Sequence, residues 1–108
     1  MSVNLPQPIA AYFAATNRHD VDAMLASFAA TAVVKDEGRE RFGTTAIREW
    51  MEETIRKYDF TVAVTDVAET DGKTVVTVRV SGKFSGSPVD LNYAITLSGE
   101  KISRLVIS

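Results

Sequence analysis

The stretch FTVAVTDVAETDGKTVVTVRVSGK, residues 60–83, decides the fold. β-Branched residues dominate both of its halves, which favours strands. Between the halves lies Asp71-Gly72, a dipeptide preferred in two-residue hairpin turns. The stretch therefore predicts an antiparallel hairpin with strands over residues 60–70 and 73–83.

The strand pattern continues beyond this hairpin to the end of the sequence. The run Ser85-Gly86-Ser87-Pro88 favours a turn, and residues 89–98 then alternate between apolar and mostly polar side chains. A second turn over residues 98–101 precedes a last strand over residues 102–107. Side chains two residues apart share a face of a strand, so each strand has one core face. The expected core set is Val76, Val78, Val80, Val89, Leu91, Tyr93, Ile95 and Leu97.

Helical spacing dominates the sequence before residue 60. Apolar residues recur at helical spacing over residues 5–17, and Asp20 can cap a second helix that we expect to end near Ala30. Residues 32–36 predict a short strand, and residues 39–43 a loop. A third helix is expected from a cap at Thr44 or Thr45 to Tyr58, with Ile47, Trp50 and Met51 on one face.

The order of elements predicts an α+β fold made of one domain, residues 1–108. An antiparallel sheet with one apolar face must cover that face with helices. We therefore expect a cone-shaped roll, in which three N-terminal helices pack on a curved, mainly antiparallel sheet and enclose a pocket. The length of 108 residues is enough for one hydrophobic core.

Composition excludes several classes of function. The formal net charge of −2 provides no basic field for nucleic acid, and the absence of cysteine excludes disulfides and thiolate chemistry. One histidine and no cysteine make a metal site untenable, and we expect no cofactor. The sequence shows neither a leader pattern nor an apolar run long enough to span a bilayer, so we expect no membrane partner and a cytoplasmic location.

Two segments carry a resemblance to a known family: FAATAVVKDEG at residues 28–38 and FGTTAIREW at residues 42–50. With the order of elements, they resemble the nuclear-transport-factor-2-like superfamily, and within it the SnoaL-like and ketosteroid-isomerase-like branch. The resemblance covers nearly the whole chain. This fold hosts isomerases, cyclases, hydrolases and proteins without catalysis, so it does not by itself define a reaction.

The resemblance implies three catalytic residues. Asp36 matches the carboxylate base of ketosteroid-isomerase relatives, and Tyr12 matches their oxyanion-donating tyrosine. Tyr93 occupies the late-strand position where those isomerases carry a protonated aspartate. Removal of a proton next to a carbonyl needs a base, and the resulting enolate needs strong hydrogen-bond donors. The implied partner is a small apolar or carbonyl-containing molecule.

The sequence departs from two other catalytic patterns of the fold. Polyketide cyclases of the SnoaL type pair a late-strand aspartate with a histidine, whereas the single histidine here is His19, between the first two helices. Epoxide hydrolases pair an arginine with an aspartate two residues on, whereas Arg79 is followed at that spacing by Ser81. Both reactions are therefore disfavoured.

Two functions stay open. In the first, the protein is an enzyme of isomerase or lyase type; in the second, it is a noncatalytic ligand-binding or dimerisation module, in which the same residues only shape a cavity. Four aromatic residues are expected to line the pocket, although aromatic residues at helical spacing are also typical of packing. They are Phe28, Phe42, Trp50 and Tyr58. The second face of the sheet predicts a homodimer.

Overall fold

The computed structural model describes residues 4–108, which contain three helices and six strands, one strand more than the sequence predicted. The helices are α1 (Gln7–Asn17), α2 (Val21–Ala26) and α3 (Gly43–Tyr58). The strands are β1 (Phe28–Asp36), β2 (Arg39–Phe42), β3 (Thr61–Thr70), β4 (Lys73–Ser81), β5 (Val89–Ser98) and β6 (Lys101–Ile107). No helix among the described residues is long and apolar enough to cross a membrane.

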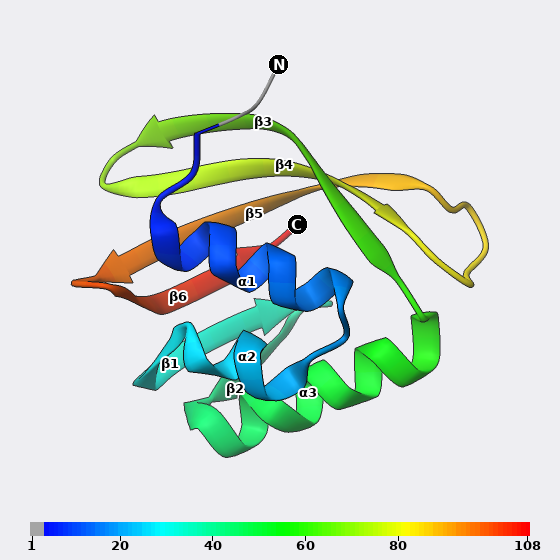
Figure 1. Cartoon of the computed structure of the whole chain (residues 1–108), viewed down its shortest axis with the longest axis horizontal. Coiled ribbons are helices and arrows are strands. Elements are labelled where there is room, and N and C mark those ends of the chain that lie inside the picture. The colour runs from blue at the N-terminus through cyan, green and yellow to red at the C-terminus, as the bar shows by residue number, and fades with distance from the viewer. Residues whose placement is uncertain (1–3) are drawn as a thin grey trace.

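The strands form one mixed, curved sheet in the order β2-β1-β6-β5-β4-β3 (Figure 1). Only β1 and β6 pair in parallel among the described strands, and every other neighbouring pair is antiparallel. The helices cover one face of this sheet, with α1 lying across its strands and α3 running below β1 and β2 in Figure 1. The predicted fold class is confirmed.

The hairpin predicted from residues 60–83 is present. Thr70 pairs with Lys73, and Asp71 and Gly72 between them have φ angles of 50° and 75°. Two consecutive positive φ angles match the twist of the flanking strands, which is why an aspartate and a glycine suit this turn.

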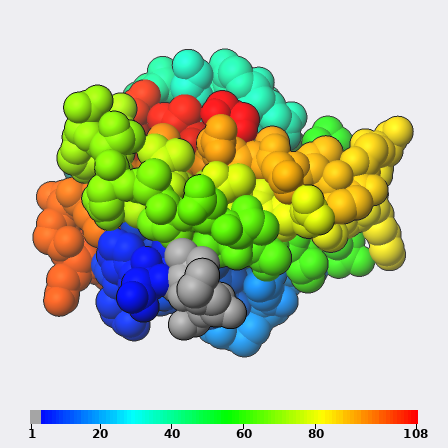
Figure 2. Space-filling view, turned by 90° about the horizontal axis from the view of Figure 1, so that it is seen from above, coloured from blue at the N-terminus to red at the C-terminus, as the bar shows by residue number. Residues whose placement is uncertain are grey.

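The end of β4 and the start of β5 project at one side of the molecule, in yellow and orange in Figure 2.

The core lies between the helices and the inner face of the sheet. Val76, Val78 and Val80 of β4 are buried as predicted, whereas Arg79 lies on the outer face and pairs with Asp90 of β5 at 3.1 Å. The helices bury Ile9, Tyr12 and Phe13 of α1 and Ile47, Trp50 and Met51 of α3. Both sets follow the helical spacing in the sequence.

Three local predictions were wrong. The second helix ends at Ala26 instead of near Ala30, because β1 already begins at Phe28, which pairs with Ile102 of β6. Residues 39–42, expected as a loop, form β2 and pair with β1 through a turn at Glu37 and Gly38, both with positive φ. The third helix begins at Gly43 without a side-chain cap.

Gly82 directly follows β4 and lies against the C-terminal end of α3. A Cβ atom at this position would lie 2.6 Å from the Tyr58 carbonyl oxygen, and the Lys83 amide donates to the same oxygen over 2.6 Å. Only glycine permits so close an approach of two backbones. This contact holds the C-terminal end of α3 against the sheet.

Candidate functional site

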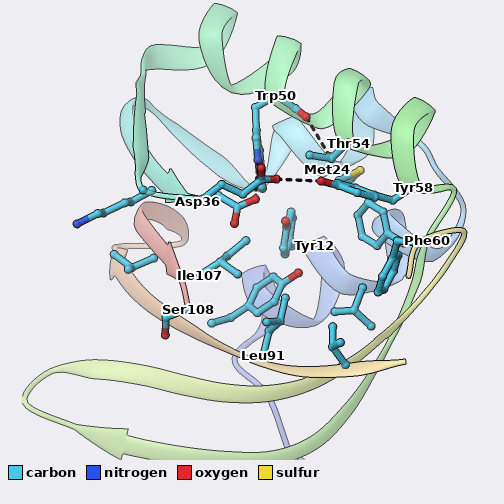
Figure 3. A pocket seen from close by; sticks show the side chains of 18 of the residues that line it. Tyr12, Met24, Asp36, Trp50, Thr54, Tyr58, Phe60, Leu91, Ile107 and Ser108 are labelled. Atoms are coloured by element: carbon cyan, nitrogen blue, oxygen red, sulfur yellow. Dashed lines mark hydrogen bonds between the residues drawn. The ribbon is translucent and has the colours of Figure 1, made fainter. Parts of the chain in front are cut away.

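A cavity of about 810 Å³ lies between the helices and the inner face of the sheet (Figure 3). Its walls come from segments that are far apart in the sequence, including α1, β1, α3 and β5. Apolar side chains such as Phe60, Leu91 and Ile107 line much of it. A cavity of this size, mostly apolar with a few converging polar groups, is typical of a site for a small organic molecule.

Asp36 faces this cavity from the end of β1. It shares a strand face with Ala32 and Val34, which are fully buried, so the alternation of the strand directs its carboxylate inward. The indole Nε1 of Trp50 donates a hydrogen bond of 3.0 Å to Asp36 Oδ2, and in Figure 3 the Trp50 side chain points from α3 toward Asp36. Burial raises the pKa of Asp36 above its usual value, and the hydrogen bond from Trp50 opposes this rise.

Tyr12 and Tyr93 line the same cavity from α1 and β5. Both side chains are buried, and burial raises the pKa of each phenol well above its usual value. The negative charge of Asp36 also raises both pKa values. Phe13 packs against both rings, at centroid distances of 5.3 Å to Tyr12 and 5.4 Å to Tyr93. The two phenols are therefore fixed hydrogen-bond donors that stay protonated at neutral pH.

Two of the four aromatic residues expected in the pocket line it. Trp50 and Tyr58 face the cavity from α3, and the Tyr58 hydroxyl lies 3.4 Å from Glu37 Oε1. Phe28 is buried outside the lining and packs edge-on against Tyr12 at 5.4 Å. Phe42 is 66% exposed. It pairs with Val33, on the strand face opposite to Asp36, so the register of β2 turns it away from the cavity.

The structure adds wall residues that were not among the expected pocket residues, and one contact. Leu91 shares a strand face with Tyr93, so the period of two already contained its position. Phe84 lies in the connection between β4 and β5, where no alternation predicts the direction of a side chain. It packs edge-on against Tyr58, with 5.7 Å between the ring centroids. The hydrogen bond from Trp50 to Asp36 could not be predicted from the sequence, because it depends on how α3 packs against β1.

The described residues contain no group of three or more histidine, cysteine, aspartate or glutamate side chains that could hold a metal ion. His19 lies in the connection between α1 and α2, and its Nε2 is 2.7 Å from the Phe60 carbonyl oxygen. This nitrogen therefore carries a proton and donates. The cavity wall contains the carboxylates of Asp36 and Glu37, the indole of Trp50 and the phenols of Tyr12, Tyr58 and Tyr93. The Tyr58 phenol lies against Glu37, so the groups available for chemistry beside Asp36 are the indole of Trp50 and the phenols of Tyr12 and Tyr93.

Comparisons with known proteins identify the family. Residues 9–104 match the model of the SnoaL-like domain. A candidate polyketide cyclase from Sinorhizobium meliloti is 36% identical, with 96% of this chain and 95% of that chain covered and a TM-score of 0.92. A hypothetical protein with a ketosteroid isomerase-like fold from Catenulispora acidiphila, in complex with trimethylamine, is 20% identical, with coverage of 97% and 86% and a TM-score of 0.84. No curated protein sequence matches this chain. From the match over residues 9–104, the chain belongs to the SnoaL-like family.

Proposed function

We propose that this protein is an enzyme that removes a proton from a carbon next to a carbonyl group of a small, mostly apolar molecule. The observation that carries the proposal is the position of Asp36, whose carboxylate faces an apolar cavity of about 810 Å³. The same cavity is lined by Tyr12 and Tyr93. A base and two neutral donors are the groups that enolate formation needs.

Asp36 is the proposed base. A general base works best when its pKa lies near the working pH, and burial raises the pKa of this carboxyl in that direction. Trp50 engages Oδ2 through its indole N–H, so we assign Oδ1 as the oxygen that accepts the proton from the substrate. We assign Trp50 the role of a positioning residue, because it acts on the carboxylate and not on the substrate.

Tyr12 and Tyr93 are the proposed oxyanion donors. Proton removal by Asp36 moves negative charge onto the carbonyl oxygen of the substrate, and a donor already held in place stabilises that charge without reorganisation. Burial keeps both phenols protonated, so each can donate throughout the reaction. Tyr93 would supply from β5 the hydrogen bond that related isomerases take from a protonated aspartate.

The similarity to a candidate polyketide cyclase supports the substrate class. That protein is 36% identical to this chain over nearly its whole length. Ring closure of a chain with several carbonyl groups starts with the same step, removal of a proton from the carbon beside a carbonyl. An isomerase and a cyclase that begin in this way both need a base and oxyanion donors, and they differ in the fate of the enolate: an isomerase returns the proton to another carbon, whereas a cyclase adds the enolate to a second carbonyl group. The aspartate–histidine pair of SnoaL-type cyclases is not matched here, so the similarity supports the substrate class and not the cyclase reaction.

The test uses β-tetralone, a small bicyclic ketone, as substrate and β-naphthol, the aromatic isostere of its enol, as ligand. We expect the protein to accelerate exchange of the proton beside the carbonyl with deuterium oxide, measured by NMR. Asp36→Asn should abolish the acceleration and retain β-naphthol binding in calorimetry. The matched control is Asp90→Asn, which removes a carboxylate on the outer face of the sheet. Binding of β-naphthol without any exchange would favour the noncatalytic ligand-binding module instead.

We further propose that the chain forms a homodimer through the outer face of the sheet. On this face Val75 pairs with Ala94, and both are half-buried beside the polar Thr77. Such a mixed face suits an isologous contact between two copies. Light scattering at micromolar concentration should give twice the chain mass of 11.8 kDa, and the single chain mass would contradict the dimer.

A further inference from the structure

A second, smaller cavity of about 170 Å³ adjoins the main one between β2 and α3. The two cavities have five wall residues in common: Asp36, Glu37, Trp50, Thr54 and Tyr58. The smaller cavity, which we call the side cavity, is lined on its far side by Arg39, Arg41, Glu53 and Lys57. The side cavity is therefore the immediate neighbour of the main cavity at Asp36 and Trp50.

Arg41 is the side-cavity residue whose surroundings point to a ligand. It pairs with Val34 in the β1–β2 register, as Arg39 pairs with Asp36, so both arginines lie on the same strand face as the proposed base. Arg41 Nη1 is buried and has no hydrogen-bond partner among residues 4–108. A buried charged donor without an acceptor costs free energy, so proteins rarely leave one unless a ligand or water completes it.

The acidic residues nearby do not neutralise Arg41 through an ion pair. The ion pairs found among the described residues do not include Arg41. Glu37 instead lies 3.4 Å from the Tyr58 hydroxyl, and Glu53 of α3 forms no ion pair among the described residues. Lys57 adds a positive charge beside the cavity, with its Nζ 5.1 Å from the centre of the Tyr58 ring. Residues 4–108 therefore provide no acceptor for the buried guanidinium nitrogen.

We propose that the side cavity is a subsite for a carboxylate group of the substrate, which Arg41 binds. A guanidinium matches a carboxylate in planar, two-point geometry, and such charge-assisted hydrogen bonds are about twice as strong as neutral ones. With its carboxylate held there, the substrate passes Asp36 and places its apolar part in the main cavity. The bound molecule is a substrate only if the proposed function holds, whereas binding of a carboxylate by Arg41 does not depend on catalysis.

The test compares β-naphthol with hydroxynaphthoic acids. In the isomers used, the hydroxyl group is on one ring of the naphthalene and the carboxylate is on the other ring. Calorimetric titration of the full chain at neutral pH gives the dissociation constant of each compound. We expect at least one acid to bind about 10-fold or more tightly than β-naphthol, the range expected for a charge-assisted hydrogen bond. Arg41→Met should remove this preference and leave β-naphthol binding unchanged within about twofold.

Two further variants make the result decisive. Arg79→Met removes the same charge from the outer face of the sheet, where Arg79 pairs with Asp90, and should keep the preference. If Arg41→Met does not fold, Arg41→Gln is used, with the same expected loss. The subsite is refuted if no acid binds more tightly than β-naphthol, if no compound binds, or if the preference persists without Arg41. Exchange of β-tetralone without a carboxylate preference would refute the subsite alone, whereas a preference without exchange would refute only the proposed function.

Discussion

Replacement of Trp50 by phenylalanine tests whether the indole sets the basicity of Asp36. The substitution keeps an aromatic ring in the core and removes the N–H that lies 3.0 Å from Asp36 Oδ2. This hydrogen bond stabilises the charged carboxylate, so its loss raises the pKa of Asp36 further. The acidic limb of the pH–rate profile, where activity appears as the base ionises, should therefore move to higher pH.

The size of this effect follows from the burial of the pair. A hydrogen bond to a charged group contributes about 1.5–3 kcal/mol. Asp36 is only partly buried, and water replaces part of the lost interaction, so the lower figure applies. About 1.5 kcal/mol corresponds to roughly tenfold tighter proton binding by the carboxyl group.

The pH–rate profile of β-tetralone exchange and a carbon NMR titration of the Asp36 carboxyl group both measure this change. Thr74→Val is the matched control, because it removes a hydroxyl that donates over 2.9 Å to the carboxylate of Glu69, at the far end of the β3–β4 hairpin. It should leave the acidic limb in place. A folded Trp50→Phe protein with an unshifted limb would refute the role assigned to the indole.

Four further substitutions have defined outcomes. Because burial raises the pKa of Asp36, the folded chain binds that proton more tightly than the unfolded chain, and the carboxylate lowers stability as the pH rises through the folded-state pKa. In urea unfolding, Asp36→Asn should thus match the wild type below the reference pKa of 3.8 and equal or exceed it at neutral pH; a large loss at neutral pH would contradict this. Tyr12→Phe and Tyr93→Phe should each lower the exchange rate constant of β-tetralone by about 10²-fold with little effect on melting temperature, and unchanged rates in both would exclude oxyanion donation. Gly82→Ala should destabilise the fold by about 1–3 kcal/mol in the same unfolding assay, because its Cβ would lie 2.6 Å from the Tyr58 carbonyl oxygen; wild-type stability would show that the two backbones can separate freely.

Elements defined by local patterns could be predicted from the sequence. The strands β3 to β6 follow from the period of two and from turn residues, above all Asp71-Gly72. The start of β1 and the whole of β2 could not be predicted in this way. Phe28 becomes a strand residue because it pairs with Ile102, more than seventy positions later in the chain. Such pairing is decided by tertiary structure, which overrides local propensity.

In the candidate site too, residues defined by local patterns could be predicted, whereas contacts that depend on tertiary packing could not. Asp36, Tyr12 and Tyr93 were expected together from the family resemblance and from strand and helix alternation, and the structure places all three in the wall of one cavity. The orientation of Phe42 depends on the register of β2, a strand that the sequence did not indicate. The contact between Trp50 and Asp36 depends on how α3 packs against β1, which no periodicity encodes.

The position of Trp50 gives the protein an optical signal of its own. The sequence has a single tryptophan, and its indole lies in the cavity wall with a hydrogen bond to Asp36. Indole emission responds to the polarity and hydrogen bonding of its surroundings. All tryptophan fluorescence of this chain therefore originates at the site, so emission from the unlabelled protein can report both occupancy of the cavity and ionisation of the carboxylate.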